Sequence, residues 1–175
     1  MDALMIKAES YMQRGEYQQA RKIYNDILAR DPNNAKAYNK LGVILAREGN
    51  VEQARVHFIN ALKLNPRLSS AASNLGNIYF EARDLEKAKE YYEKAIALDP
   101  ENPIPYNNLA VIYKQSKDID KYVKFYKKSV ELSARRISSS GIPQQKKGAM
   151  RPVYKAVTGF LAIALVIYLL TSFVR

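Results

Sequence analysis

Apolar residues recur along most of the chain at intervals of three and four positions, the spacing that brings side chains onto one face of an α-helix. Leu41, Ile44 and Leu45 form one such face, and a second face follows over residues 54–62. Polar residues fill most of the positions between them. The pattern therefore predicts an all-α fold built from short amphipathic helices.

This helical pattern repeats with a period of 34 residues. Pro32, Pro66 and Pro100 each follow an Asp or Asn at the end of a predicted helix. A fixed period in this range is typical of stacked helical arrays. The period divides the chain without gaps into four blocks, at residues 1–34, 35–68, 69–102 and 103–136.

Aligning the blocks brings residues of similar size into the same columns. Small residues are needed where two helix axes approach closely, and large residues fill the space beside them. The alignment therefore predicts which side chains pack between helices. The columns are Leu41, Leu75 and Leu109; Gly42, Gly76 and Ala110; Ala20, Ala54 and Ala88; Tyr11, Leu45, Tyr79 and Tyr113; and Tyr24, Phe58, Tyr92 and Tyr126.

Each block divides into two helices at a short turn. Gly15 and Gly49 suit the left-handed residue that commonly follows a helix. Asn50, Asp84 and Asp118 have the short polar side chains that cap the N-terminus of a following helix. We therefore expect a helix–turn–helix unit in every block.

These columns resemble the signature of the tetratricopeptide repeat family over residues 1–136. The block at 35–68 matches eight signature positions, whereas the first and last blocks depart from several, as terminal repeats do when one side faces water. The resemblance implies a right-handed superhelical array of about four repeats, the last with a long, Lys-rich second helix. The eight matching residues are Tyr38, Leu41, Gly42, Leu45, Ala54, Phe58, Ala61 and Pro66.

A different pattern follows the blocks. Residues 156–174 form an uncharged run rich in Leu, Ile, Val and Phe. As a helix, this run would span roughly 28 Å, close to the hydrocarbon thickness of a bilayer. The repeats account for their own apolar faces, so we expect a transmembrane helix over 153–174 rather than another core helix.

Residues 137–152, between the blocks and this run, predict a flexible basic linker because Ser, Gly and Pro interrupt any helical pattern. All the basic residues after position 132 except Arg175 precede the apolar run, so the positive-inside rule places the repeats in the cytoplasm. The layout resembles that of tail-anchored membrane adaptors. A bacterial inner membrane and a mitochondrial outer membrane are not distinguished. The linker's charges either bind lipid headgroups or only set the topology.

Composition excludes several classes of chemistry. The chain has no Cys and only one His, which argues against disulfides and metal sites. Its net charge is +11, but much of the excess lies in the tail, and eight of its 13 Tyr fall in packing columns, so nucleic-acid binding is not expected. The sequence contains neither a phosphate-binding Gly-rich loop nor a nucleophile beside a base. We therefore expect neither an enzyme nor a cofactor.

The resemblance implies that the first helix of each repeat lines a concave groove that binds a protein segment. Asn is frequent at the inward positions, and its amide can pair with the main chain of an extended peptide, although Asn is also common on ordinary solvated helices. Lys and Arg there would favour an acidic peptide. The inward residues are Lys36, Asn39, Lys40, Val43, Arg47, Ser70, Asn74, Asn77, Phe80, Asn107, Asn108, Val111 and Lys114.

The sequence thus favours a membrane-anchored adaptor or scaffold that binds a protein partner through this groove. The alternative is a structural scaffold whose repeat arrays stack on copies of themselves into homo-oligomers at the membrane.

Overall fold

The computed structural model describes residues 2–139, which contain eight α-helices and no strand. The predicted all-α architecture is therefore confirmed for this part of the chain. A first compact unit ends at Arg135, and the last residues of the final helix belong to a second unit. The helices are α1 (Asp2–Gln13), α2 (Tyr17–Arg30), α3 (Ala35–Arg47), α4 (Val51–Leu64), α5 (Ser69–Glu81), α6 (Leu85–Leu98), α7 (Pro103–Gln115) and α8 (Ile119–Ser139).

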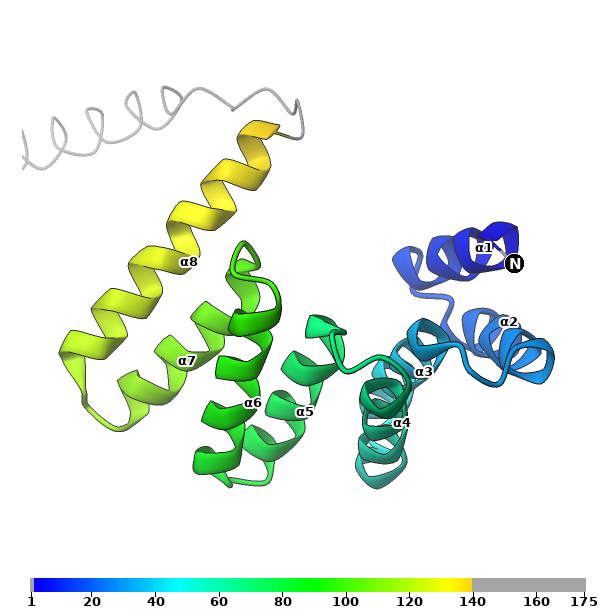
Figure 1. Cartoon of the computed structure of the whole chain (residues 1–175), viewed down its shortest axis with the longest axis horizontal. Helices are drawn as coiled ribbons and strands as arrows, with labels where there is room; N and C mark the ends of the chain where they lie inside the picture. Colours follow the sequence, from blue (N-terminus) through cyan, green and yellow to red (C-terminus); the bar gives the residue numbers. More distant parts are fainter. Residues whose placement is uncertain (1, 140–175) are drawn as a thin grey trace, which may run out of the picture. The chain divides into compact units, whose positions relative to one another are not determined.

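The helices are arranged as four consecutive helix–turn–helix pairs, one for each predicted block (Figure 1). We call the pairs α1–α2, α3–α4, α5–α6 and α7–α8 repeats 1 to 4. The first helix of a repeat also packs on the second helix of the repeat before it, as α3 does on α2, α5 on α4, and α7 on α6. The array is therefore held together by contacts between neighbouring repeats.

The turns inside the repeats share one backbone geometry. Gly15 and Gly49 have φ of 77° and 81°, the left-handed conformation that the sequence predicts. Arg83 and Lys117 take the same position in repeats 3 and 4, with φ of 64° and 61°. A non-glycine residue in this conformation costs roughly 1 kcal/mol, which the packing of the flanking helices must offset.

Side-chain caps confirm two of the three predicted helix starts. Asp84 accepts a hydrogen bond from the backbone N–H of Lys87 at 3.2 Å, and Asp118 accepts one from Lys121 at 3.1 Å. Asn50 also stands at the predicted N-cap of α4, but its side chain makes no capping hydrogen bond.

In each of repeats 1 to 3, one aromatic ring forms the centre of the packing. Tyr24, Phe58 and Tyr92 are only 0%, 2% and 1% exposed. Each ring belongs to a buried cluster that includes a Leu and an Ile from the first helix of the next repeat. The pairs that pack with the three rings are Leu41 and Ile44, Leu75 and Ile78, and Leu109 and Ile112.

Tyr126, the corresponding ring of repeat 4, is 47% exposed, so its predicted place in the packed column was wrong. No described helix follows α8 to supply the covering Leu and Ile. Tyr122 also stands where repeats 1 to 3 have a fully buried Ala, and this larger side chain does not allow the same close approach of α8 to α7.

The long, Lys-rich second helix expected for the last block is present as α8, which continues to Ser139, three residues into the predicted linker. The rest of that linker and the predicted transmembrane helix at 153–174 lie outside the described residues. Within residues 2–139, none of the helices combines the length and the hydrophobicity that crossing a bilayer requires.

The packing of Gly76 against Tyr92 gives a stability prediction. A Cβ atom built on Gly76 would lie 2.5 Å from Cε1 of the Tyr92 ring, so a larger side chain must displace a fully buried ring. We expect Gly76→Leu to lower the free energy of unfolding by about 1–3 kcal/mol or more. Ala97→Leu, at an exposed position on α6, is the control and should change it by less than about 0.5 kcal/mol. Equal urea midpoints for the two variants would contradict this packing.

Candidate protein-binding groove

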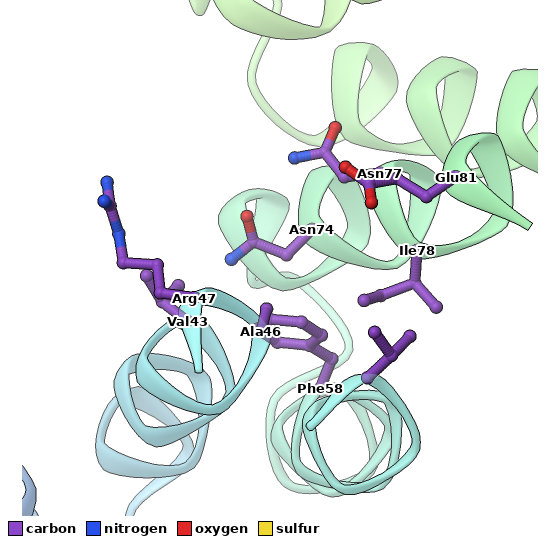
Figure 2. Close-up of a pocket in the computed structure, with 9 residues that line it drawn as sticks. Val43, Ala46, Arg47, Phe58, Asn74, Asn77, Ile78 and Glu81 are labelled. Carbon is purple, nitrogen blue, oxygen red and sulfur yellow. The ribbon is translucent and has the colours of Figure 1, made fainter. Parts of the chain in front are cut away.

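A cavity of about 360 Å³ opens between α3, α4 and α5 (Figure 2). The ring of Phe58 lies between α3 and α5, with Ala46 and Ile78 near it, and Arg47 extends away from the ring on the α3 side. The cavity therefore has an apolar floor and a polar edge. Its lining residues are Val43, Ala46, Arg47, Val51, Phe58, Asn74, Asn77, Ile78 and Glu81.

A second cavity, of about 250 Å³, lies one repeat further along, between α5, α6 and α7. Every residue that lines it stands 34 positions after a residue that lines the first cavity. The two cavities are therefore the same place in consecutive repeats, and we refer to them together as the groove. The second cavity is lined by Asn77, Phe80, Glu81, Tyr92, Asn108 and Val111.

The two cavities differ at the ring that forms their floor. Phe58 has no polar atom, whereas the hydroxyl of Tyr92 donates a hydrogen bond to Oδ1 of Asn77 at 2.8 Å. Burial raises the pKa of Tyr92 above its usual value, so the hydroxyl remains protonated and available as a donor at neutral pH. The first cavity is therefore apolar at its base, and the second contains a fixed polar group.

Amides of the groove pair with one another across repeat boundaries. Nδ2 of Asn74 donates to Oδ1 of Asn39 at 2.9 Å, and Nδ2 of Asn39 donates to Oγ of Ser70 at 3.2 Å. Asn39 is only 5% exposed. Its predicted place on the binding surface is therefore wrong, because its amide is used inside the protein to join repeat 2 to repeat 3.

A second amide pair joins repeats 3 and 4. Nδ2 of Asn108 donates to Oδ1 of Asn77 at 2.9 Å, so that oxygen accepts from both Asn108 and Tyr92. Asn77 is nevertheless exposed and lines both cavities. Asn77 is therefore the amide best placed to meet a ligand that extends from one cavity to the other.

Charges of both signs border the groove. Arg47 is exposed, and its guanidinium lies 5.2 Å from the centre of the Tyr17 ring. Lys40 is paired with Glu9 at 3.1 Å, and Glu81 lines both cavities. The fixed charges do not by themselves select an acidic segment, because a carboxylate stands between the cavities.

The structure brings seven of the predicted site residues to the cavities: Val43, Arg47, Asn74 and Asn77 line the first, and Phe80, Asn108 and Val111 line the second, where Asn77 also contributes. The other six, Lys36, Asn39, Lys40, Ser70, Asn107 and Lys114, line neither cavity.

Sequence reasoning missed Phe58 and Tyr92 as lining residues, because it assigned their shared column wholly to the core. Both rings are almost fully buried and nevertheless line a cavity. Within residues 2–139, no three His, Asp or Glu side chains converge in a way that could hold a metal ion.

Three family models match the sequence. A tetratricopeptide repeat model matches residues 33–101, a TPR repeat model matches residues 8–49, and a second tetratricopeptide repeat model matches residues 91–121. No curated protein matches the chain significantly.

Several solved structures share the fold. A crystal structure of MamA is 26% identical, with a TM-score of 0.65, and the match covers 78% of this chain and 80% of that one. The structure of MamA residues 41 to the end from Desulfovibrio magneticus RS-1 is 24% identical, with a TM-score of 0.62, over 77% of this chain and 76% of that one. The second likeness concerns the fold alone.

The amide pair at Asn39 gives a second stability prediction. Asn74→Ala removes the donor to Oδ1 of Asn39 and leaves this nearly buried oxygen without its partner. We expect a loss of about 1–3 kcal/mol in the free energy of unfolding, measured by urea denaturation. Asn107→Ala is the matched control, since Asn107 is exposed, and it should change stability by less than about 0.5 kcal/mol. If both variants unfold at the same urea concentration, the pair contributes nothing to stability.

Proposed function

Because the chain belongs to the tetratricopeptide repeat family, we propose that it is a membrane-anchored adaptor or scaffold that holds an extended segment of a partner protein in its groove. The observation that carries this proposal is the pair of equivalent cavities, one repeat apart. In an extended segment every second side chain points to the same side. Two such side chains can therefore enter the two cavities, which recur along the array.

The chemistry of the groove supports a segment with apolar side chains at both contact points. The first cavity has Phe58, Val43 and Ile78 among its lining, and burial of an aliphatic side chain there is favourable by roughly 25 cal/mol per Å² of apolar surface. Asn77, between the cavities, offers an amide to the main chain of the segment. Such recognition would depend on the spacing of the side chains more than on their exact identity.

The membrane part of the proposal rests on sequence. Residues 156–174 contain no charged side chain, and Lys146, Lys147, Arg151 and Lys155 precede them. A run of this length and composition is typical of a membrane-spanning helix, and the basic residues favour a cytoplasmic position for the repeats. We therefore propose that the repeats recruit their partner to the cytoplasmic face of a membrane, or hold a complex together there.

Groove substitutions test the binding proposal. Arg47 and Val111 are both exposed and line different cavities, so Arg47→Glu with Val111→Asp should alter the surface without disturbing the core. We expect this double variant of the full-length chain to capture the partner at least tenfold less well, a loss of about 1.4 kcal/mol or more in binding free energy. The measurement is quantitative affinity capture from cells, with circular dichroism to show an unchanged fold.

The matched control carries the same chemical changes elsewhere. Val56 and Lys63 are exposed on α4 and line neither cavity, so Lys63→Glu with Val56→Asp should capture the partner normally. Equal capture by the two double variants would place the binding site outside the groove. If instead the wild-type chain sediments as an oligomer that the groove variant alone dissociates, copies of the chain occupy the groove, and the self-assembling scaffold is the better account.

An alkaline carbonate wash tests the membrane proposal. We expect the full-length chain to stay with the membrane pellet, because extraction would expose about 19 apolar and uncharged positions to water. A chain that ends at Arg151 should appear in the supernatant. Release of the full-length chain by the wash would rule out an integral span while leaving the groove proposal open.

A further inference from the structure

One face of α8 presents apolar side chains to solvent. Ile119, Val123, Tyr126, Val130 and Ile137 are all exposed. The first four are separated by four, three and four positions, so they lie along a single stripe of the helix. A stripe of this kind normally packs against another element.

Beside this stripe, a cavity of about 370 Å³ opens between α7 and α8, and we call it the end groove. Pro103, Ile104 and Asn107 line it from α7, and Tyr126, Val130 and Ser133 are among the residues that line it from α8. Asn107 was predicted to lie in the concave groove, and the structure places it here.

The position of the end groove within repeat 4 indicates which kind of helix would pack into it. Tyr126 corresponds to Tyr24, Phe58 and Tyr92, which are covered by the first helix of the next repeat. The end groove is therefore the place where the first helix of a fifth repeat would lie. The three internal helices that make this contact share a pattern: Ala or Pro, then Leu four residues later, then Ile three residues after that, as in Ala37, Leu41 and Ile44; Ala71, Leu75 and Ile78; and Pro105, Leu109 and Ile112.

The chain's own sequence does not continue this pattern. Pro143 and Lys146 stand 17 and 20 positions after Tyr126, where the earlier repeats have the Leu and the Ile. Ser133 and Ala134 also replace the Asx–Pro pair that ends the second helix of each earlier repeat, and α8 runs on past them. The sequence after α8 therefore lacks the Leu and the Ile that a fifth repeat would place over Tyr126.

A second copy of the chain fits poorly as well. Its uncovered first helix is α1, but α1 has Lys7 and Ser10 at the Leu and Ile positions, both exposed. Pairing of two α8 helices would bring like charges together, since α8 carries six basic and only two acidic residues.

We propose that the end groove binds an amphipathic helix of a different protein, one that presents a small residue or Pro, a Leu and an Ile at this spacing, flanked by acidic residues. Leu and Ile of that helix would cover Tyr126 and Val130 as the internal pairs cover their rings. Glu or Asp beside them would meet Lys127, which is exposed next to Tyr126. Other cations of α8 contribute less, since Lys121 already contacts Asp118, and Lys128 and Arg135 contact Glu131. This surface is separate from the concave groove and does not depend on what binds there.

A defined peptide tests the proposal directly. The probe is a fluorescein-labelled helical peptide of about 18 residues, long enough for four or five turns, that carries the Ala–Leu–Ile stripe on a Glu-rich background. We expect it to bind the full-length chain in mild detergent, as measured by fluorescence anisotropy. Val130→Asp should weaken binding at least tenfold, whereas Val56→Asp should not, although the two valines are 49% and 50% exposed.

Two altered peptides separate the apolar and the charged contributions. Replacing the Leu of the stripe by Lys, as in α1, should abolish binding, and replacing the flanking Glu residues by Lys should weaken it at least tenfold. Equal binding to the Val130→Asp and Val56→Asp chains would overturn the proposed site. Equal binding of the Glu and Lys peptides would overturn the proposed acidic character of the partner.

A single cysteine identifies any competing occupant. The natural chain has no Cys, so Val130→Cys introduces a unique thiol into the full-length protein. We expect this thiol to react with a maleimide as fast as Val56→Cys does, and to become at least tenfold slower when the peptide is present. Slow reaction of a monomeric chain without peptide would show that the chain's own residues cover the groove. Rapid disulfide dimerisation on oxidation would show that a second copy does. Either result would overturn the proposal.

Discussion

Repeats 1 to 3 each depend on the burial of one aromatic ring, Tyr24, Phe58 or Tyr92. In repeats 2 and 3 the ring packs on one side against a glycine of its own first helix, at a distance that leaves no room for a Cβ atom. On the other side it packs against a Leu and an Ile from the next repeat. Because one ring satisfies both contacts, the internal packing of a repeat and its docking to the next are a single interaction, and the 34-residue period follows from it.

The groove follows from the same arrangement. Phe58 and Tyr92, which hold the repeats together, also form the floors of the two cavities. The cavities must therefore recur with the period of the packing, although their edges differ. The amide pairs Asn39–Asn74 and Asn77–Asn108 join successive repeats at the rim of the groove. A ligand that bound across both cavities would thus meet a surface whose spacing is already fixed.

The sequence was sufficient for most of the fold because helix spacing, small-residue columns and turn residues all indicated the same period. The predictions failed where the burial of a side chain depends on a helix of the following repeat. Asn39 has the position of a groove residue, but Ser70 and Asn74 from the next repeat enclose it. Tyr126 has the sequence of a core ring, but its burial requires a helix that no described residue supplies. The cavities themselves could not be derived, since their shape depends on how three helices meet.

The uneven ends of the array have a consequence for how it unfolds. In a linear array each repeat is stabilised by its neighbours, so the terminal repeats are opened more easily than the internal ones. Repeat 1 meets water with Lys7 and Ser10, whereas repeat 4 meets it with Tyr126 and Val130. Only Ser129 and Leu132 of α8 are buried, fewer residues than in any of the helices α2 to α7, so fraying of the array should begin at α8. A ligand that covers Tyr126 would bind only when α8 is docked, so its binding free energy would stabilise repeat 4 against unfolding. Because each repeat is stabilised by its neighbour, the rest of the array would be stabilised as well.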